Sequence, residues 1–122
     1  MNGHNESGLL DRTALDALQE MVGDDSAFYV EMIDTYLADA PSLLAEMQAA
    51  AQSGDAATLR RSAHTLKSNS RTFGALALGD LCQQIEEFAA NGMVEAATPL
   101  VDDVTKQLPT VTAALAAERE AT

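Results

Sequence analysis

The stretch DAATLRRSAHTLKSNSRTFG, residues 55–74, decides the fold because it has the pattern of one complete amphipathic helix. Asp55 can cap its start, and Gly74 can end it. Apolar side chains recur along it at helical spacing: Leu59, Ala63, Leu66 and Phe73. A second set, which we call the basic stripe, has the same spacing: Arg60, His64, Lys67 and Arg71. On a helix with about 100° per residue, the two sets of side chains lie more than roughly 90° apart around the helix axis. We therefore predict a helix over 55–73 with His64 facing outward.

The same stretch interrupts the acidity of the chain. The protein has 19 Asp and Glu residues and a formal net charge of −12, yet no carboxylate side chain lies between Asp55 and Asp80. Four of the seven basic residues lie in that interval: Arg60, Arg61, Lys67 and Arg71. On a strongly acidic surface, this local reversal is easier to explain as a site that receives negative charge than as a means of solubility. Phosphate is the leading candidate for that charge.

Two helices are predicted before this stretch. A short helix capped by Asp11 or Thr13 is expected to end at Gly23. The Asp24-Asp25-Ser26 cluster then opens a longer helix, in which apolar residues again keep helical spacing until Ser53-Gly54-Asp55 breaks it. We expect Pro41 to kink this helix, because proline removes an internal hydrogen bond and clashes with the preceding turn.

Two more helices are predicted after it. The first covers residues 76–88 and is stopped by the Asn91-Gly92 pair. The last is rich in alanine, and we expect Pro99 and Pro109 to interrupt it. Its charged end, residues 118–122, is expected to fray.

These segments together predict an all-α fold, an antiparallel up-and-down four-helix bundle with a short additional N-terminal helix packed at one end. Hydrophobic residues make up 47% of the chain and aromatic residues only 4%, so the core is expected to be aliphatic. At 122 residues the chain fits one domain, which we place at residues 11–118 behind a flexible N-terminal tail at 1–10. Met1 and the polar start of the chain favour a free-standing protein.

Composition argues against several classes of function. A net charge of −12 argues against binding to nucleic acid or to anionic membranes, and no uncharged apolar run approaches the length of a membrane span. Cys82 is the single cysteine and cannot form an internal disulfide, which together with a polar N-terminus favours a cytoplasmic protein. His4 and His64 have no acidic companions at metal-binding spacing, so no metal site is predicted. A monomer is expected.

The residues around His64 resemble the signature of histidine-containing phosphotransfer (HPt) domains. The matching stretch is AHTLKSNSRTFGA, residues 63–75, followed by Leu81-Cys82 and Ile85-Glu86. A histidine with lysine at +3 and Gly-Ala at +10 is moderately specific, and flanking helices in the matching order make the resemblance strong. It extends over most of the chain and implies a four-helix bundle. Ser68 is a departure, since the family more often has glycine there, but its side chain is still small enough to let a partner approach the imidazole.

The resemblance implies that His64 is the phosphoryl acceptor of a phosphorelay intermediate. The histidine would accept a phosphoryl group from the phospho-aspartate of one receiver domain and pass it to an aspartate of another. This chemistry suits imidazole, because its neutral form is a good nucleophile at about pH 7 and phosphohistidine gives its phosphoryl group onward. Lys67, one turn away on the same face, is placed to stabilise the phosphoryl group. The protein would then be a carrier rather than an autonomous enzyme.

The same resemblance implies the partners. Receiver domains of response regulators and of hybrid histidine kinases are expected to dock around the histidine, and the candidate docking residues are Arg60, Arg61, Ser68 and Arg71. The domain is expected to bind no cofactor of its own. Mg²⁺ is expected in the acidic pocket of the receiver, because the sequence shows no cluster of carboxylates around His64.

Two alternatives remain open at this point. A bundle of the same fold could bind a receiver domain or a histidine kinase without carrying phosphate, although the presence of both His64 and Lys67 argues against this. The chain could also be a phosphohistidine-using transferase or the dimerisation domain of a sensor kinase. A kinase of that kind needs an ATP-binding domain and usually has an acidic residue directly after the histidine, where this chain has Thr65.

Overall fold

The structure is a computed structural model that describes residues 9–23 and 25–122. The described residues form five helices and no strand: α2 (Arg12–Met21), α3 (Ser26–Ser53), α4 (Ala56–Thr72), α5 (Leu76–Ala90) and α6 (Val94–Ala121). The predicted all-α fold is therefore confirmed, and each predicted helix has a counterpart within a few residues of the expected bounds.

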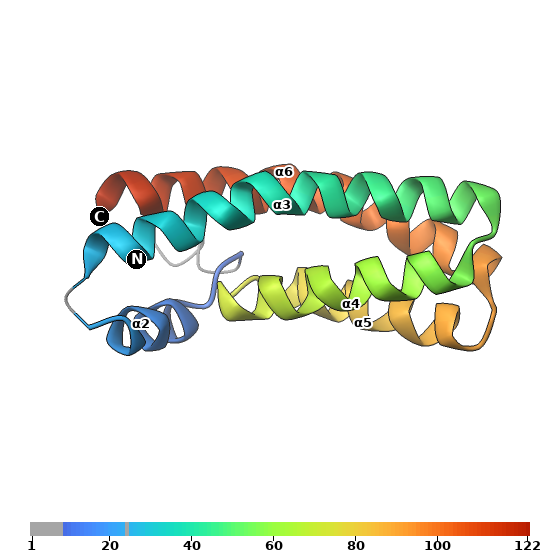
Figure 1. The fold of residues 1–122 in the computed structure, drawn as a ribbon, viewed down its shortest axis with the longest axis horizontal. Helices are drawn as coiled ribbons and strands as arrows, with labels where there is room; N and C mark the ends of the chain where they lie inside the picture. The colour runs from blue at the N-terminus through green and yellow to red at the C-terminus, as the bar shows by residue number, and fades with distance from the viewer. Residues whose placement is uncertain (1–8, 24) are drawn as a thin grey trace.

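The four long helices form an antiparallel bundle (Figure 1). Helix α3 packs against α4 and α6, and α5 packs against the same two helices, so each long helix has two neighbours. Helix α2 is short and lies at one end of the bundle, where it contacts α3 and α4. This arrangement places the outer face of α4 between α3 on one side and α5 on the other.

Helix α4 starts and ends as its sequence predicts. The Asp55 side chain accepts a hydrogen bond from the Thr58 backbone N–H at 3.1 Å, which satisfies one of the free donors in the first turn. Beyond its C-terminus, Gly74 has a φ of 80°, a conformation that glycine adopts without steric cost. Its carbonyl accepts a hydrogen bond from the Asp11 N–H at 2.7 Å, so the turn after α4 also anchors the segment that enters α2.

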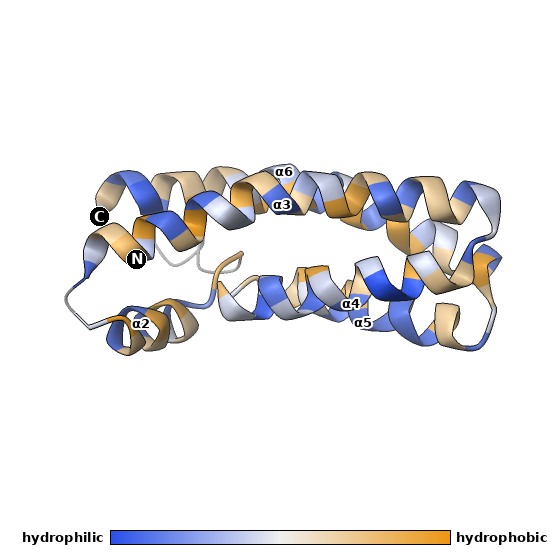
Figure 2. Ribbon diagram, in the orientation of Figure 1, coloured by the Kyte–Doolittle hydropathy of each residue, from blue (hydrophilic) through white to orange (hydrophobic). Residues whose placement is uncertain are grey.

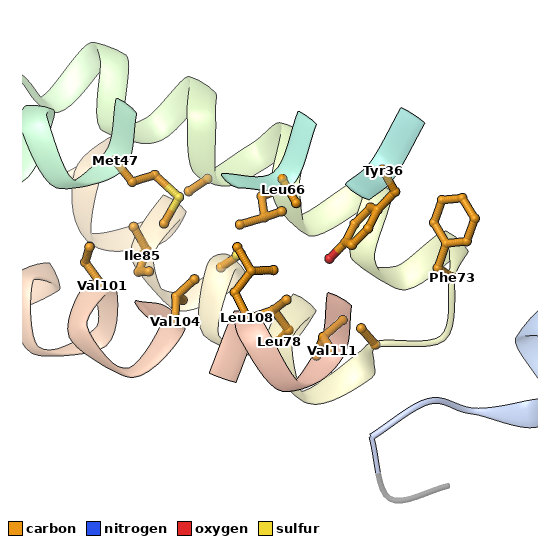
Figure 3. Close-up of a cluster of buried hydrophobic side chains, with 14 of the residues drawn as sticks. Tyr36, Met47, Leu66, Phe73, Leu78, Ile85, Val101, Val104, Leu108 and Val111 are labelled. Atoms are coloured by element: carbon orange, nitrogen blue, oxygen red, sulfur yellow. The ribbon is translucent and has the colours of Figure 1, made fainter. Parts of the chain in front are cut away.

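The core is mainly aliphatic, as the composition predicts, and three aromatic side chains join it: Tyr29, Tyr36 and Phe73. Buried leucine, isoleucine, valine, alanine and methionine side chains from all five helices fill it, and Figure 3 shows part of this cluster. Hydrophilic and hydrophobic residues alternate along the long helices in Figure 2, as expected for helices that bury only one face. One polar contact crosses the core: the hydroxyl groups of Tyr36 and Ser70 lie 2.8 Å apart, joining α3 to α4.

The prolines do not divide the last helix, and this expectation from the sequence was wrong. Helix α6 runs through Pro99 and Pro109 without a break, just as α3 runs through Pro41. All three prolines lie on exposed faces, so the backbone carbonyls left without a helical N–H donor are near water.

Residues near both ends of the described chain are held by contacts with the bundle. Helix α6 continues to Ala121, and Glu118 accepts hydrogen bonds from Arg12 and Tyr29, which holds the C-terminal turns that were expected to fray. At the other end, Leu10 is buried in the core, one residue before the boundary predicted at residue 11. Residues 1–8 of the predicted tail, including His4, lie outside the described residues. No helix in the described ranges is both long and apolar enough to span a membrane.

Candidate functional site

His64 lies on the outer face of α4, as the amphipathic pattern predicts. Its side chain is 58% exposed, whereas the neighbouring Ala63 and Leu66 are fully buried. The imidazole is therefore held on a rigid helix and is open to a partner.

A glutamate that the sequence analysis did not assign completes the site. Glu86 of α5 lies across from α4, and its carboxylate contacts both His64 and Lys67. One oxygen is 2.8 Å from Nδ1 of His64, and the other accepts a hydrogen bond from Nζ of Lys67 at 2.6 Å. The sequence contained a signal for this residue, because Glu86 follows the buried Ile85 and therefore lies at the edge of the face that α5 presents to the bundle.

The electrostatics of this group fix the hydrogen-bonding direction. Burial acts to raise the pKa of the Glu86 carboxyl, but hydrogen bonds from Lys67 and His64 outweigh it, so the pKa is lowered. Glu86 is therefore ionised at neutral pH and can only accept hydrogen bonds, which makes Nδ1 of His64 the donor. In the neutral imidazole, the other nitrogen, Nε2, then carries the free lone pair.

The structure does not bring all of the basic stripe together. Arg71 turns away from His64 toward α5, where its guanidinium lies 3.3 Å from the Asp80 carboxylate and 3.2 Å from the Gln83 side-chain oxygen. Its methylene chain covers Gly79, and a β-carbon at that glycine would lie only 2.8 Å from Cγ of Arg71. Arg71 thus has a structural role between α4 and α5 in addition to any role in docking.

The remaining candidate docking residues are exposed. Arg60 lies one turn before His64 and has no hydrogen bond or ion pair with any residue in 9–23 or 25–122. The Arg61 side chain makes a long 3.5 Å hydrogen bond to the Thr58 hydroxyl. Ser68, one turn after His64, is exposed and small, so it leaves the approach to the imidazole open. Lys67 differs from these residues, because its side chain is only 15% exposed and is engaged by Glu86.

A groove lies between α3 and α4, one to two turns along from His64. Its volume is about 270 Å³, and its lining combines apolar and small polar side chains: Met32, Thr35, Tyr36, Asp39, Asn69, Thr72 and Phe73. Exposed apolar area continues along α3 to Phe28, which is 49% exposed. The groove offers a partner both shape and apolar contact on the α3 side of α4, one to two turns from the histidine.

Other chemistry is poorly supported in the described part of the chain. No group of three or more His, Cys, Asp or Glu side chains there is arranged to hold a metal ion. The thiol of Cys82 is buried, and burial raises its pKa to about 12, so it is not a nucleophile at neutral pH. His64, with Glu86 and Lys67 beside it, is the centre of the site.

Comparisons with known proteins identify the family and the fold of the chain. The model of the Hpt domain family matches residues 31–120, which include α4, α5 and the whole site. The histidine-containing phosphotransfer protein B (HptB) of Pseudomonas aeruginosa PAO1 superposes with a TM-score of 0.84 at 32% sequence identity, covering 93% of this chain and 96% of that one. The HPT domain of a sensor hybrid histidine kinase from Shewanella has the same fold, with a TM-score of 0.74 at 24% identity over 88% of this chain and 93% of that one.

No curated protein matches the chain in sequence. The family match nevertheless covers most of its length, and a solved structure that shares almost a third of its residues covers nearly all of it. An exposed histidine on the outer face of a four-helix bundle is thus found in a chain whose sequence and fold both match phosphotransfer domains. The chain belongs to the Hpt domain family.

Proposed function

We propose that His64 carries a phosphoryl group on Nε2, taking it from the phospho-aspartate of one receiver domain and giving it to an aspartate of another. Membership of the Hpt family supports a role in phosphorelay histidine phosphotransfer. One observation carries the assignment to Nε2. Glu86 binds Nδ1 at 2.8 Å on the protein side, while the ring is largely exposed, so the nitrogen with the free lone pair is the one available to a partner.

The transfer needs no further group from this chain to act as a base. The Nε2 lone pair attacks phosphorus, the bond from phosphorus to the aspartyl oxygen breaks, and its electron pair stays on the aspartate carboxylate. The proton on Nδ1 stays in place and is shared with Glu86. Transfer to the next receiver is the reverse of this step, with the electron pair of the P–N bond returning to Nε2.

Lys67 supports the phosphoryl group by moving its ammonium group from Glu86 to the phosphoryl oxygens. Its ammonium group is bonded to Glu86 at 2.6 Å, one helical turn from His64, and a dianionic phosphoryl group on Nε2 competes with that carboxylate for it. Mg²⁺ comes with the receiver, whose acidic pocket also holds the aspartate that exchanges the phosphoryl group. The carrier itself then supplies only the nucleophile and cationic support.

The docking surface combines the α3–α4 groove with the exposed start of the basic stripe. The groove supplies apolar contact one to two turns from His64, and Arg60 supplies a cation that is not engaged by the described part of the chain. A receiver domain presents an acidic pocket around its aspartate, so a cation at this position favours the encounter and its orientation. Receiver domains of response regulators and of hybrid kinases are the proposed partners.

Transfer from a phosphorylated receiver domain tests the proposal. The wild-type protein is expected to gain a label that is stable to alkali and lost in acid, and His64→Gln is expected to gain none. Incubation with ATP alone is expected to give no label. Failure to label the folded wild-type protein from several different receivers would instead favour a bundle that docks a receiver without carrying phosphate.

A further inference from the structure

We propose that Glu86 keeps the phosphoryl group on His64 transferable at neutral and alkaline pH, by holding a proton on Nδ1 of the phosphorylated ring. The inference rests on the proposed function and concerns the state after His64 has been loaded. It starts from the 2.8 Å contact between the Glu86 carboxylate and Nδ1.

The proton on Nδ1 decides how easily the phosphoryl group leaves. When Nδ1 is protonated, breaking the P–N bond returns an electron pair to Nε2 and releases neutral imidazole. When Nδ1 has lost its proton, the same bond must release an imidazolate anion, which is a far poorer leaving group. An ionised carboxylate in contact with Nδ1 favours the protonated form, since it pairs with the positive charge of the ring.

Among the charged groups around His64, Glu86 is the carboxylate that pairs with the protonated ring. On α4, the charged neighbours of His64 in the basic stripe are Arg60 and Lys67, which both disfavour a second positive charge. On α3, Glu46 accepts a hydrogen bond from Ser62, and Asp39 lines the groove farther along.

Helix α2 approaches α4 near the C-terminal end of α4. There the backbone N–H of Asp11 donates a hydrogen bond to the carbonyl oxygen of Gly74. On α5, Glu87 accepts a hydrogen bond from Gln83 instead. Among the described residues, Glu86 alone is in hydrogen-bonding contact with the ring.

The substitution Glu86→Gln separates this role from simple positioning. Glutamine has the same shape, and its amide can rotate to accept from Nδ1–H or to donate to a bare Nδ1, so it removes the preference for the protonated ring. Glu87→Gln is the matched control, because it removes the same charge from the next residue of the same helix without touching His64.

The experiment uses phosphoramidate as a small phosphoryl donor, so that no receiver is required. Each protein is labelled, freed of donor, and incubated at a series of pH values while loss of the label to water is followed. Water attacks phosphorus, and the P–N electron pair returns to Nε2, so hydrolysis reports the same leaving group as transfer. The ³¹P NMR signal of the label gives ring protonation independently, and far-UV circular dichroism checks the fold.

We expect Glu86→Gln to lose its label about tenfold more slowly than wild type at alkaline pH, since an opposite charge in contact favours the charged form by at least this factor. The two rates should converge in mild acid, where both rings are protonated, and Glu87→Gln should follow wild type throughout. A ratio of rates that does not change with pH would overturn the inference, because a positioning role or a freed Lys67 would act equally at every pH. Absence of any label that depends on His64, from phosphoramidate and from several receivers alike, would reject the proposed function itself, and the inference with it.

Discussion

Ser70 shows what a single hydroxyl group contributes inside this bundle. Ser70 is fully buried. The only hydrogen-bond partner of its side-chain hydroxyl among the described residues is the hydroxyl of Tyr36, at 2.8 Å. We expect Ser70→Ala to lower the free energy of unfolding by about 1–3 kcal/mol, because it leaves the Tyr36 hydroxyl buried without a partner. Urea denaturation measures the change. The double variant Tyr36→Phe, Ser70→Ala removes both groups and should cost less than the two single changes added together, and simple additivity would contradict the coupling.

Cys82 is expected to be chemically inert while the protein is folded. Burial raises the pKa of its thiol to about 12, despite the opposing effect of Arg71 and Lys67, and the side chain is inaccessible. A disulfide reagent at about pH 8 should therefore label native protein only as fast as the protein opens, and label it at once in strong denaturant. Rapid labelling of the native protein would show that α5 opens locally.

The chemistry of the site was predictable in part. The spacing of Arg60, His64, Lys67 and Arg71 on a helix correctly placed the histidine outward on α4. It could not show that Arg71 turns to α5, because that depends on a neighbouring helix and on the space left by Gly79. Glu86 was missed for the same reason. Helical periodicity describes the faces of one helix, whereas the carboxylate of Glu86 lies on α5 and contacts a histidine on α4.

At the scale of elements, Gly74 controls how α2 joins the bundle. A β-carbon added there would lie 2.7 Å from the Asp11 carbonyl oxygen, in addition to the strain of a φ of 80°. We expect Gly74→Ala to destabilise the protein by about 2 kcal/mol or more, since backbone cannot move aside as a side chain can. Thermal unfolding measures the loss.

Gly92 provides the control for this change. It has nearly the same φ, 73°, but no atom lies within 4 Å of the position of an added β-carbon. Gly92→Ala should therefore cost only the conformational strain, about 1 kcal/mol. Equal losses at the two glycines would show that the contact with Asp11 is unimportant.

Helix α2 is also held from the opposite end of the chain. Arg12 donates two hydrogen bonds of 2.8 Å to Glu118 of α6, and the hydroxyl of Tyr29 donates a third to the same carboxylate. The hydrogen bonds from Arg12 lower the pKa of Glu118, and burial only partly opposes them, so the stabilisation is present above the ordinary carboxyl pKa and is lost as pH falls through the lowered value.

Arg12→Gln tests this contact. Because the Arg12 side chain is half exposed, we expect a loss of only about 1 kcal/mol at neutral pH. The difference from wild type should shrink as the pH falls below the ordinary carboxyl range, and vanish at a pH low enough to protonate the carboxylate in both proteins. Urea denaturation at the two pH values measures it, and a difference that persists in acid would point to packing of the arginine chain instead.

Most elements of the fold could be predicted because turn residues and apolar spacing agree along the chain. Asp55 and the glycines at 54, 74 and 92 marked helix ends that the structure confirms. The prediction that Pro99 and Pro109 interrupt the last helix was wrong, because proline breaks a helix only where the lost hydrogen bond and the ring cannot be accommodated. Their exposure on α6 is a property of the assembled bundle and not of the local sequence.

At the scale of the whole molecule, charge dominates the response to solvent. A net charge of −12 on a chain of 122 residues means that its carboxylates repel one another on average. We expect the melting temperature at neutral pH to rise by several degrees between about 10 mM and about 300 mM NaCl, because screening weakens this repulsion over distances beyond the Debye length. Circular dichroism measures the melts, and a fall in melting temperature would show that the ion pairs outweigh the repulsion.

The pairing of α4 with α5 also bears on the order in which the protein folds. His64, Lys67 and Glu86 all belong to these two helices, which are adjacent in sequence and joined only by the residues around Gly74. Bringing them together closes a short loop and costs little chain entropy, whereas pairing α3 with α6 closes a much longer one. We therefore expect the contacts around the histidine to be among the earliest that form, before α6 closes the bundle.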